Sequence, residues 1–154
     1  MVTLVLAIPA FLTGPIIWPP ADMGVEPTAG QLPFFIFLAV FEAITLGLGV
    51  SFLLFGLPVV RRISAGSKLR AWAMYLSIGW LMVSWWPHNN LHMATGMDLQ
   101  GLLYIEYGFH LTLMIAGIAL GYGFLSLISE RDEATSTGPV GVESAVTAES
   151  PVRP

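Results

Sequence analysis

The stretch PFFIFLAVFEAITLGLGVSFLLFGLPVV, residues 33–60, decides the fold, because Glu42 is its single charged side chain. A helix needs about 20 mostly apolar residues to cross the hydrocarbon core of a bilayer, and this stretch is long enough to cross with tilt. Ala39, Ala43 and Gly47 recur at four-residue intervals, a pattern that lets helix backbones approach closely in lipid. The stretch predicts a transmembrane helix packed tightly against a neighbour.

The composition of the whole chain agrees with this prediction. Of its 154 residues 55% are hydrophobic and 10% charged, and the mean hydropathy is +0.75, whereas about a quarter of the residues in a soluble domain are charged. At about 20 residues a span, the length allows about four spans and a short tail. We therefore expect an all-α membrane protein, a four-transmembrane-helix bundle over residues 1–128. Its spans are predicted at residues 2–18, 33–60, 69–86 and 102–128.

The first of these segments, 2–18, could be a span or a signal sequence. It is interrupted by Pro9 and Pro15 and ends before Pro19 and Pro20. A secretory signal peptide has a basic region before its apolar run and small residues at its cleavage site. Both features are missing here, which favours a span.

The distribution of charge predicts the topology. Four of the six basic residues lie within residues 61–70, so by the positive-inside rule this loop is expected in the cytoplasm of a multi-pass protein of the cell membrane. Four spans then place both termini in the cytoplasm. Residues 129–154 are acidic and polar with few large apolar side chains, and are predicted to form a disordered cytoplasmic tail. The net charge of −4 argues against a nucleic-acid partner.

Two further features concern the third and fourth spans. Pro87 predicts the end of the third helix, so residues 88–101 are expected to form an outer loop or a re-entrant turn. In the fourth span Gly117 and Gly121 form a G-x-x-x-G pattern with Gly123 beyond it, which predicts a close helix contact.

Three ionisable residues, Glu42, Glu106 and His110, lie inside the apolar segments, where such groups are costly and face a bundle interior, a partner or a cavity. At about 1.5 Å per residue, Glu42 and His110 each lie about 12 to 14 Å below the outer surface, so they can pair if their helices are neighbours. Glu106 lies one turn from His110 on the same helix face. These positions predict an outward-facing polar site.

Histidine and carboxylate spacing points to a metal. His88 and His92 form H-x-x-x-H, and after thirteen intervening residues Glu106 and His110 form E-x-x-x-H. With Asp98 between them, these residues are the candidate ligands for copper, iron or zinc, since the chain has no cysteine. Glu42 and Glu106 are the candidate catalytic carboxylates, with Glu42 as a proton acceptor or a residue behind the ligands.

Other interpretations of the same residues stay open. Haem b could be held between histidines on facing helices, and a lipid or small hydrophobic molecule could bind between aromatic walls. A Glu42–His110 pair could serve only to fix helix register. The histidines could also fail to converge, since one residue of register turns a helix by about 100°. The candidate binding walls are Trp85, Trp86 and Tyr104.

We therefore expect a small integral membrane subunit of a larger membrane complex. Its partners are the lipid bilayer and other transmembrane subunits or further copies of itself, because glycine-lined helices with little mass outside the membrane favour helix partners. The leading catalytic hypothesis is a metal-dependent membrane oxidoreductase or a subunit of one. The alternative is a non-catalytic assembly subunit.

Overall fold

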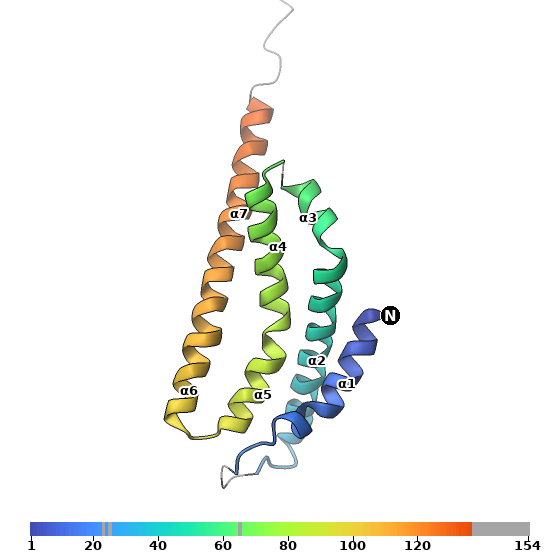
Figure 1. The fold of residues 1–154 in the computed structure, drawn as a ribbon, viewed down its shortest axis with the longest axis vertical. Coiled ribbons are helices and arrows are strands. Elements are labelled where there is room, and N and C mark those ends of the chain that lie inside the picture. Colours follow the sequence, from blue (N-terminus) through green and yellow to red (C-terminus); the bar gives the residue numbers. More distant parts are fainter. Residues whose placement is uncertain (23, 25, 65, 137–154) are drawn as a thin grey trace, which may run out of the picture.

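The computed structural model describes residues 1–22, 24, 26–64 and 66–136, and this part of the chain is all α-helical. Six helices follow one another when the last three elements are taken as one continuous rod (Figure 1). The elements are α1 (Val2–Ile17), α2 (Leu32–Phe55), α3 (Leu57–Ile63), α4 (Lys68–Val83), α5 (Trp85–Thr95), α6 (Leu99–Ile105), the π-helix η1 (Glu106–His110) and α7 (Leu111–Ser136).

Two helices are long and apolar enough to cross a membrane by length and composition. They are α2, with 24 residues, and the continuous helix Leu99–Glu133, with 35 residues. The apolar helix α1 has 16 residues and is about 24 Å long, shorter than the hydrocarbon core of about 30 Å. The all-α prediction is confirmed, and two of the four predicted spans meet the length requirement on their own.

The long helices form a row. α2 packs between α1 and α4, and α4 packs between α2 and α7 (Figure 1). The main helix contacts of α7 are with α4, so α7 and α2 lie on opposite sides of α4. The sequence predicts a four-helix bundle without the order of its helices, and the structure arranges them as an open row. Helices that are apolar on all faces have no single apolar face that must be buried at the centre of a bundle.

The small-residue pattern of α2 lies at close helix contacts, as predicted. Gly47 lies against the backbone carbonyl of Thr3 in α1, so close that a Cβ atom would collide with it. Ala43 is buried against Ala7 and Ala10. Backbones can approach this closely only where side chains are absent or small.

Of the three glycines of α7, only one lies at a close helix contact within the described part of this chain. Within the described part of the chain, no atom lies within 4 Å of where a Cβ of Gly117 or Gly121 would stand. Gly123 does lie at a close contact, because its Cβ position is 2.7 Å from Cγ of Met74 in α4. α7 is therefore rotated so that the G-x-x-x-G face points away from this chain's other helices.

The third predicted span continues beyond Pro87, contrary to expectation. The helix is interrupted at Ser84, and Pro87 becomes the third residue of α5. The N–H groups of a first helical turn have no partner within the helix, so proline is tolerated there. The segment expected as an outer loop is thus mostly helical, and the chain reverses in a short turn at Gly96, whose φ is +59°.

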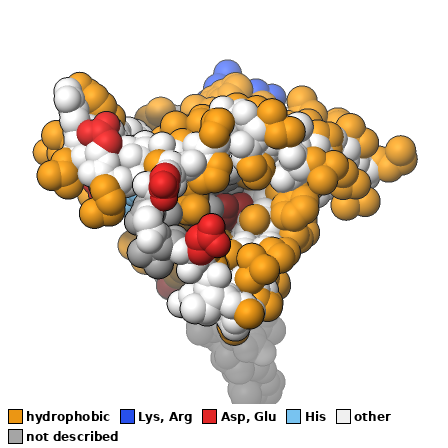
Figure 2. All heavy atoms as spheres, turned by 90° about the horizontal axis from the view of Figure 1, so that it is seen from below, with side chains coloured by type: hydrophobic (Ala, Val, Ile, Leu, Met, Phe, Trp, Pro, Cys, Tyr) orange, Lys and Arg blue, Asp and Glu red, His pale blue; other side chains and the backbone are white. Residues whose placement is uncertain are grey.

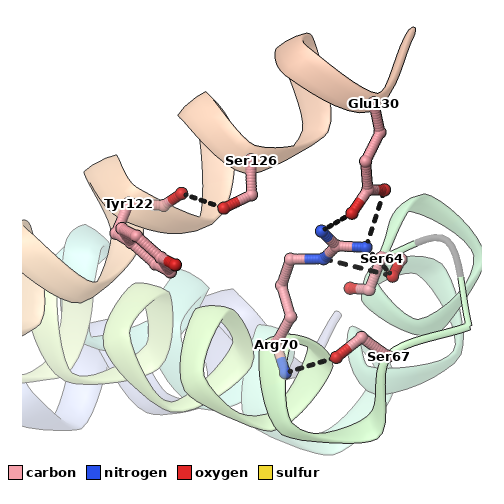
Figure 3. Close-up of polar contacts among 6 residues, drawn as sticks. All are labelled: Ser64, Ser67, Arg70, Tyr122, Ser126 and Glu130. Carbon is pink, nitrogen blue, oxygen red and sulfur yellow. Dashed lines mark hydrogen bonds and ion pairs between the residues drawn. The ribbon is translucent and has the colours of Figure 1, made fainter. Parts of the chain in front are cut away.

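The start of the predicted disordered tail is also helical. α7 extends to Ser136, and residues 137–154 lie outside the described part of the chain. Arg70 holds this extension, because its guanidinium donates to both carboxylate oxygens of Glu130 at 2.5 and 3.0 Å (Figure 3). The same guanidinium donates to the carbonyl of Ser64 at 2.7 and 3.2 Å. A tertiary ion pair therefore offsets the weak apolar content of the segment.

Candidate metal centre

The candidate site is formed by α5 and η1, at the end of the row opposite the 61–70 loop (Figure 1). The turn after Thr95 makes α5 and the following helix antiparallel neighbours. Asp98 is the N-cap of α6, because its carboxylate accepts the backbone N–H of Gln100 at 3.1 Å. Viewed from this end, acidic side chains stand among hydrophobic ones, and basic side chains are visible only at the far edge (Figure 2).

Three histidines converge at this end. His88 and His92 stand four residues apart on one face of α5, and His110 reaches them from η1. One ligand atom from each lies within 4.8 Å of the other two. Nε2 of His88 and Nε2 of His92 are 3.1 Å apart, and the ring centroids of His88 and His110 are 4.7 Å apart. This group could hold a metal ion.

The convergence depends on the π-helix η1. Its closing hydrogen bond runs from the backbone N–H of Leu111 to the carbonyl of Glu106, five residues earlier. A π-turn takes in one residue more than an α-turn, and one residue of an α-helix corresponds to about 100° of rotation. The π-turn therefore helps to set the direction in which His110 points relative to α7.

Glu106 supports His110 from within the same turn. A carboxylate oxygen of Glu106 forms a short hydrogen bond with Nδ1 of His110. Histidines that bind metals commonly donate their second ring N–H to a carboxylate, which fixes the tautomer and the ring orientation. Nε2 of His110 then remains free to bind a metal. The side chain of Glu106 is 50% exposed and that of His110 is 43% exposed, so this side of the site is open.

Aromatic rings form the walls of the site. Trp85 meets His88 edge-on at 5.9 Å between ring centroids, and Phe109 lies 5.3 Å from His88. Trp80 of α4 stacks on Phe109 at 5.9 Å and donates its indole N–H to the hydroxyl of Thr112 at 3.0 Å. These contacts join α4, η1 and α7, and they hold α5 and η1 in register.

Glu42 lies elsewhere and is hydrogen-bonded to Asn89; it could pair with His110 only if their helices were neighbours, which they are not. Glu42 is 6% exposed and accepts a hydrogen bond from Nδ2 of Asn89 at 2.9 Å. α4 and α5 stand between α2 and η1, so the equal depths of the two residues do not bring them together. Asn89 was not among the predicted residues; its position next to His88 in a polar segment was the available signal.

The remaining candidates are dispersed. Trp86 packs edge-on against Trp18 at 4.9 Å, beside the alanine cluster of α1 and α2. Tyr104 is 69% exposed, and its hydroxyl accepts a hydrogen bond from the amide of Gln100 at 3.4 Å. Trp85 is the one member of the predicted aromatic walls that meets a histidine of the site. Asp98 is engaged in its helix cap and does not belong to the three-histidine group.

The spacing of the imidazole nitrogens suits a small ion. Zn–N bonds are about 2.0–2.1 Å long, so tetrahedral nitrogen ligands are about 3.4 Å apart. The 3.1 Å between His88 and His92 is already close to that value. The largest separation in the group, 4.8 Å, needs to close by roughly 1.4 Å, which side-chain rotation can supply.

Comparison of the chain with protein-family models, curated proteins and solved structures finds no match.

Proposed function

We propose that this protein is a small integral membrane metalloprotein, a subunit of a larger membrane assembly, whose three histidines hold one copper, iron or zinc ion. The observation that carries the proposal is the meeting of three imidazoles from two helices within 4.8 Å. Three protein ligands leave a position for water, substrate or a partner's group. With copper or iron the site would support electron transfer or oxidation, and the protein would be a membrane oxidoreductase or part of one.

Apolar surface supports the membrane setting. In the most apolar windows of α2 and of the Leu99–Glu133 helix, 22% and 17% of residues are buried inside the chain. A core helix of a soluble protein would be mostly buried. Side chains such as Phe34, Phe37, Ile118 and Leu125 are half exposed or more. A hydrocarbon solvent or neighbouring subunits would cover this surface.

The proposed orientation of the protein in the membrane follows from the residues at the two ends of the helical row. The basic 61–70 loop is at one end and the histidines are at the other. By the positive-inside rule the loop and the start of the tail face the cytoplasm, and the metal site opens on the outer side. The exposed G-x-x-x-G face of α7 favours further transmembrane subunits or a second copy as partners.

A bare ion suits the site better than haem b. Two axial histidines of a haem approach the iron from opposite faces of the porphyrin. Here the rings of His88, His92 and His110 all adjoin, with centroids 4.6 to 6.1 Å apart, and leave no plane between them. Imidazole nitrogen suits copper, iron and zinc, so supply and geometry would choose among them.

A structural subunit is the second candidate. The observation that favours it is the hydrogen bond between His88 and His92, which together with the Glu106–His110 pair gives each imidazole a partner without a metal. Under this account the polar residues fix helix positions only.

Metal analysis separates the two candidates. The protein is extracted from membranes in detergent, and its copper, iron and zinc are measured beside a His92→Asn/His110→Asn double variant. We expect about one metal per chain in the wild type and none in the variant, because one imidazole cannot hold the ion.

Two controls make the result decisive. Arg70→Gln lies at the opposite end and should retain the metal, and circular dichroism should show equal helix content in all samples. A wild-type protein that stays folded and binds no copper, iron or zinc when these are supplied in excess would leave the structural subunit as the account.

A further inference from the structure

A hollow of about 400 Å³ lies at the basic end of the row, far from the histidines. It is bordered by the end of α3, the α3–α4 turn and the first turns of α4. Its lining is basic and aromatic, with the side chains of Arg61, Ser67, Lys68 and Trp72 around it. The guanidinium of Arg61 stands 5.9 Å above the ring of Trp72, which turns the cation toward the hollow's aromatic side.

The cations of this hollow are not neutralised by any acidic side chain in the described part of the chain. Arg70, the neighbouring cation, is fully engaged by Glu130 and the carbonyl of Ser64 (Figure 3). Within the described residues neither Arg61 nor Lys68 forms an ion pair. The Ser67 hydroxyl caps α4 by accepting the N–H of Arg70, and its own proton is free to be donated. The hollow therefore presents two cations and a hydroxyl donor to an anion.

Apolar surface leads away from the hollow along α4. Trp72 and Leu76 are 43% and 55% exposed and stand four residues apart on one helix face. An anion bound between Arg61 and Lys68 would thus have an apolar track beside it. A ligand that fills both parts has a negatively charged head and a hydrocarbon body.

We propose that the hollow bordered by Arg61, Ser67, Lys68 and Trp72 binds the phosphate of one anionic glycerophospholipid, with an acyl chain lying along Trp72 and Leu76. Basic pockets at the cytoplasmic ends of transmembrane helices are suited to such head groups. The inference rests on the membrane placement of the proposed function and is independent of the metal.

The test compares two single variants that remove the same charge from adjacent positions. Arg61 lines the hollow and Arg62 does not. Wild type, Arg61→Gln and Arg62→Gln are purified in a neutral detergent. Each is titrated with phosphatidylglycerol or with phosphatidylcholine of the same acyl chains, and bound lipid is counted by native mass spectrometry.

We expect one phosphatidylglycerol per chain and weaker binding of phosphatidylcholine. Arg61→Gln should weaken phosphatidylglycerol binding about five-fold, since one basic residue near a membrane contributes about 1 kcal/mol. Arg62→Gln should bind as the wild type does. Equal losses in both variants would overturn the proposal, because they would indicate diffuse attraction to the surface.

A competition experiment and a second variant complete the test. Inorganic phosphate at millimolar concentration should not displace the lipid; displacement would make a free anion the ligand and overturn the lipid assignment. If Arg61→Gln loses helix content, Lys68→Gln is tested in its place, and it too should weaken phosphatidylglycerol binding about five-fold. The metal content of each sample is measured in parallel, so a failure of the metal site and a failure of the lipid site are separate results.

Discussion

The two ends of the helical row treat their ionisable groups in opposite ways. At the basic end Arg70 and Glu130 neutralise each other across 60 residues of sequence and join α4 to α7. At the other end three imidazoles lie close together, and one of them is hydrogen-bonded to a carboxylate. An ion pair is complete without a ligand, whereas three adjoining imidazole rings could also hold a metal ion. The two ends therefore differ as a structural joint differs from a group that could bind a metal.

Loss of one central histidine should have the largest effect. His88 lies between the other two rings, and asparagine offers no comparable nitrogen ligand. We expect His88→Asn to weaken metal affinity by more than about 100-fold, because removing a ligand exceeds the 10–100-fold cost of removing its supporting group. Competition with a chromophoric chelator measures this. Unchanged affinity would remove His88 from the site.

The carboxylate behind His110 should have the next effect. Glu106→Gln keeps the size of the side chain and removes its charge, so metal affinity is expected to fall about 10–100-fold. Asp98→Asn removes the same charge nearby, and asparagine is an equally good N-cap, so affinity should stay the same. Equal losses in the two variants would mean that general negative charge, and not the His110 contact, supports the metal.

Helix contact can be compared at two glycines. Gly47→Ala places a methyl group against the backbone of Thr3, which cannot move aside as a flexible side chain can. We expect the free energy of unfolding to fall by about 1–3 kcal/mol. Gly121→Ala points into open space and should change it little. Unfolding in mixed micelles, followed by circular dichroism, measures both; a larger loss for Gly121→Ala would show that its face is covered in the sample.

Glu42 tests whether its hydrogen bond with Asn89, which joins α2 to α5, is structural. Glu42→Gln can still accept the hydrogen bond of Asn89, so stability should change by less than about 1 kcal/mol. Glu42→Leu removes this partner from the partly buried amide of Asn89 and should cost about 1–3 kcal/mol. Metal content should be normal in both. Loss of metal from a folded Glu42→Gln protein would instead connect Glu42 to the site.

The smallest effect is expected at the Arg70–Glu130 joint, because the carboxylate of Glu130 is about half exposed to solvent. The hydrogen bond from Arg70 holds the pKa of Glu130 below its ordinary value of 4.5. A carboxyl with a lowered pKa stabilises the folded state above its unfolded-state pKa, and this contribution is lost as pH falls through the folded-state pKa. Stability measured from pH 6 downward should therefore decline below about pH 4.5. Glu130→Gln should lack that part of the decline.

The sequence predicted the helical class, the tight packing of α2 and the residues of the histidine group. These rest on local patterns: apolar length, small residues at fixed intervals, and histidines one helical turn apart. The sequence did not predict the row, the rotation of α7 or the continuation of α5 past Pro87. Each depends on which helices become neighbours, or on backbone interruptions at Ser84 and Glu106–His110 that no residue type marks.

Glu42 illustrates the same limit. Its depth was estimated from the helix rise, and depth alone made His110 a possible partner. The intervening position of α4 and α5 made Asn89 the actual partner. Distance along a helix is thus readable from sequence, while the order of helices in a layer requires the structure.

X-ray absorption at the metal edge of the purified, metal-loaded protein would count the nitrogen ligands of the ion and measure their distances, so it tests the three-histidine site itself. We expect three imidazoles at about 2.0–2.1 Å from one ion in the wild type, and two in His92→Asn. A metal with a shell of oxygen ligands only, or one whose spectrum is the same in wild type and His92→Asn, would contradict it.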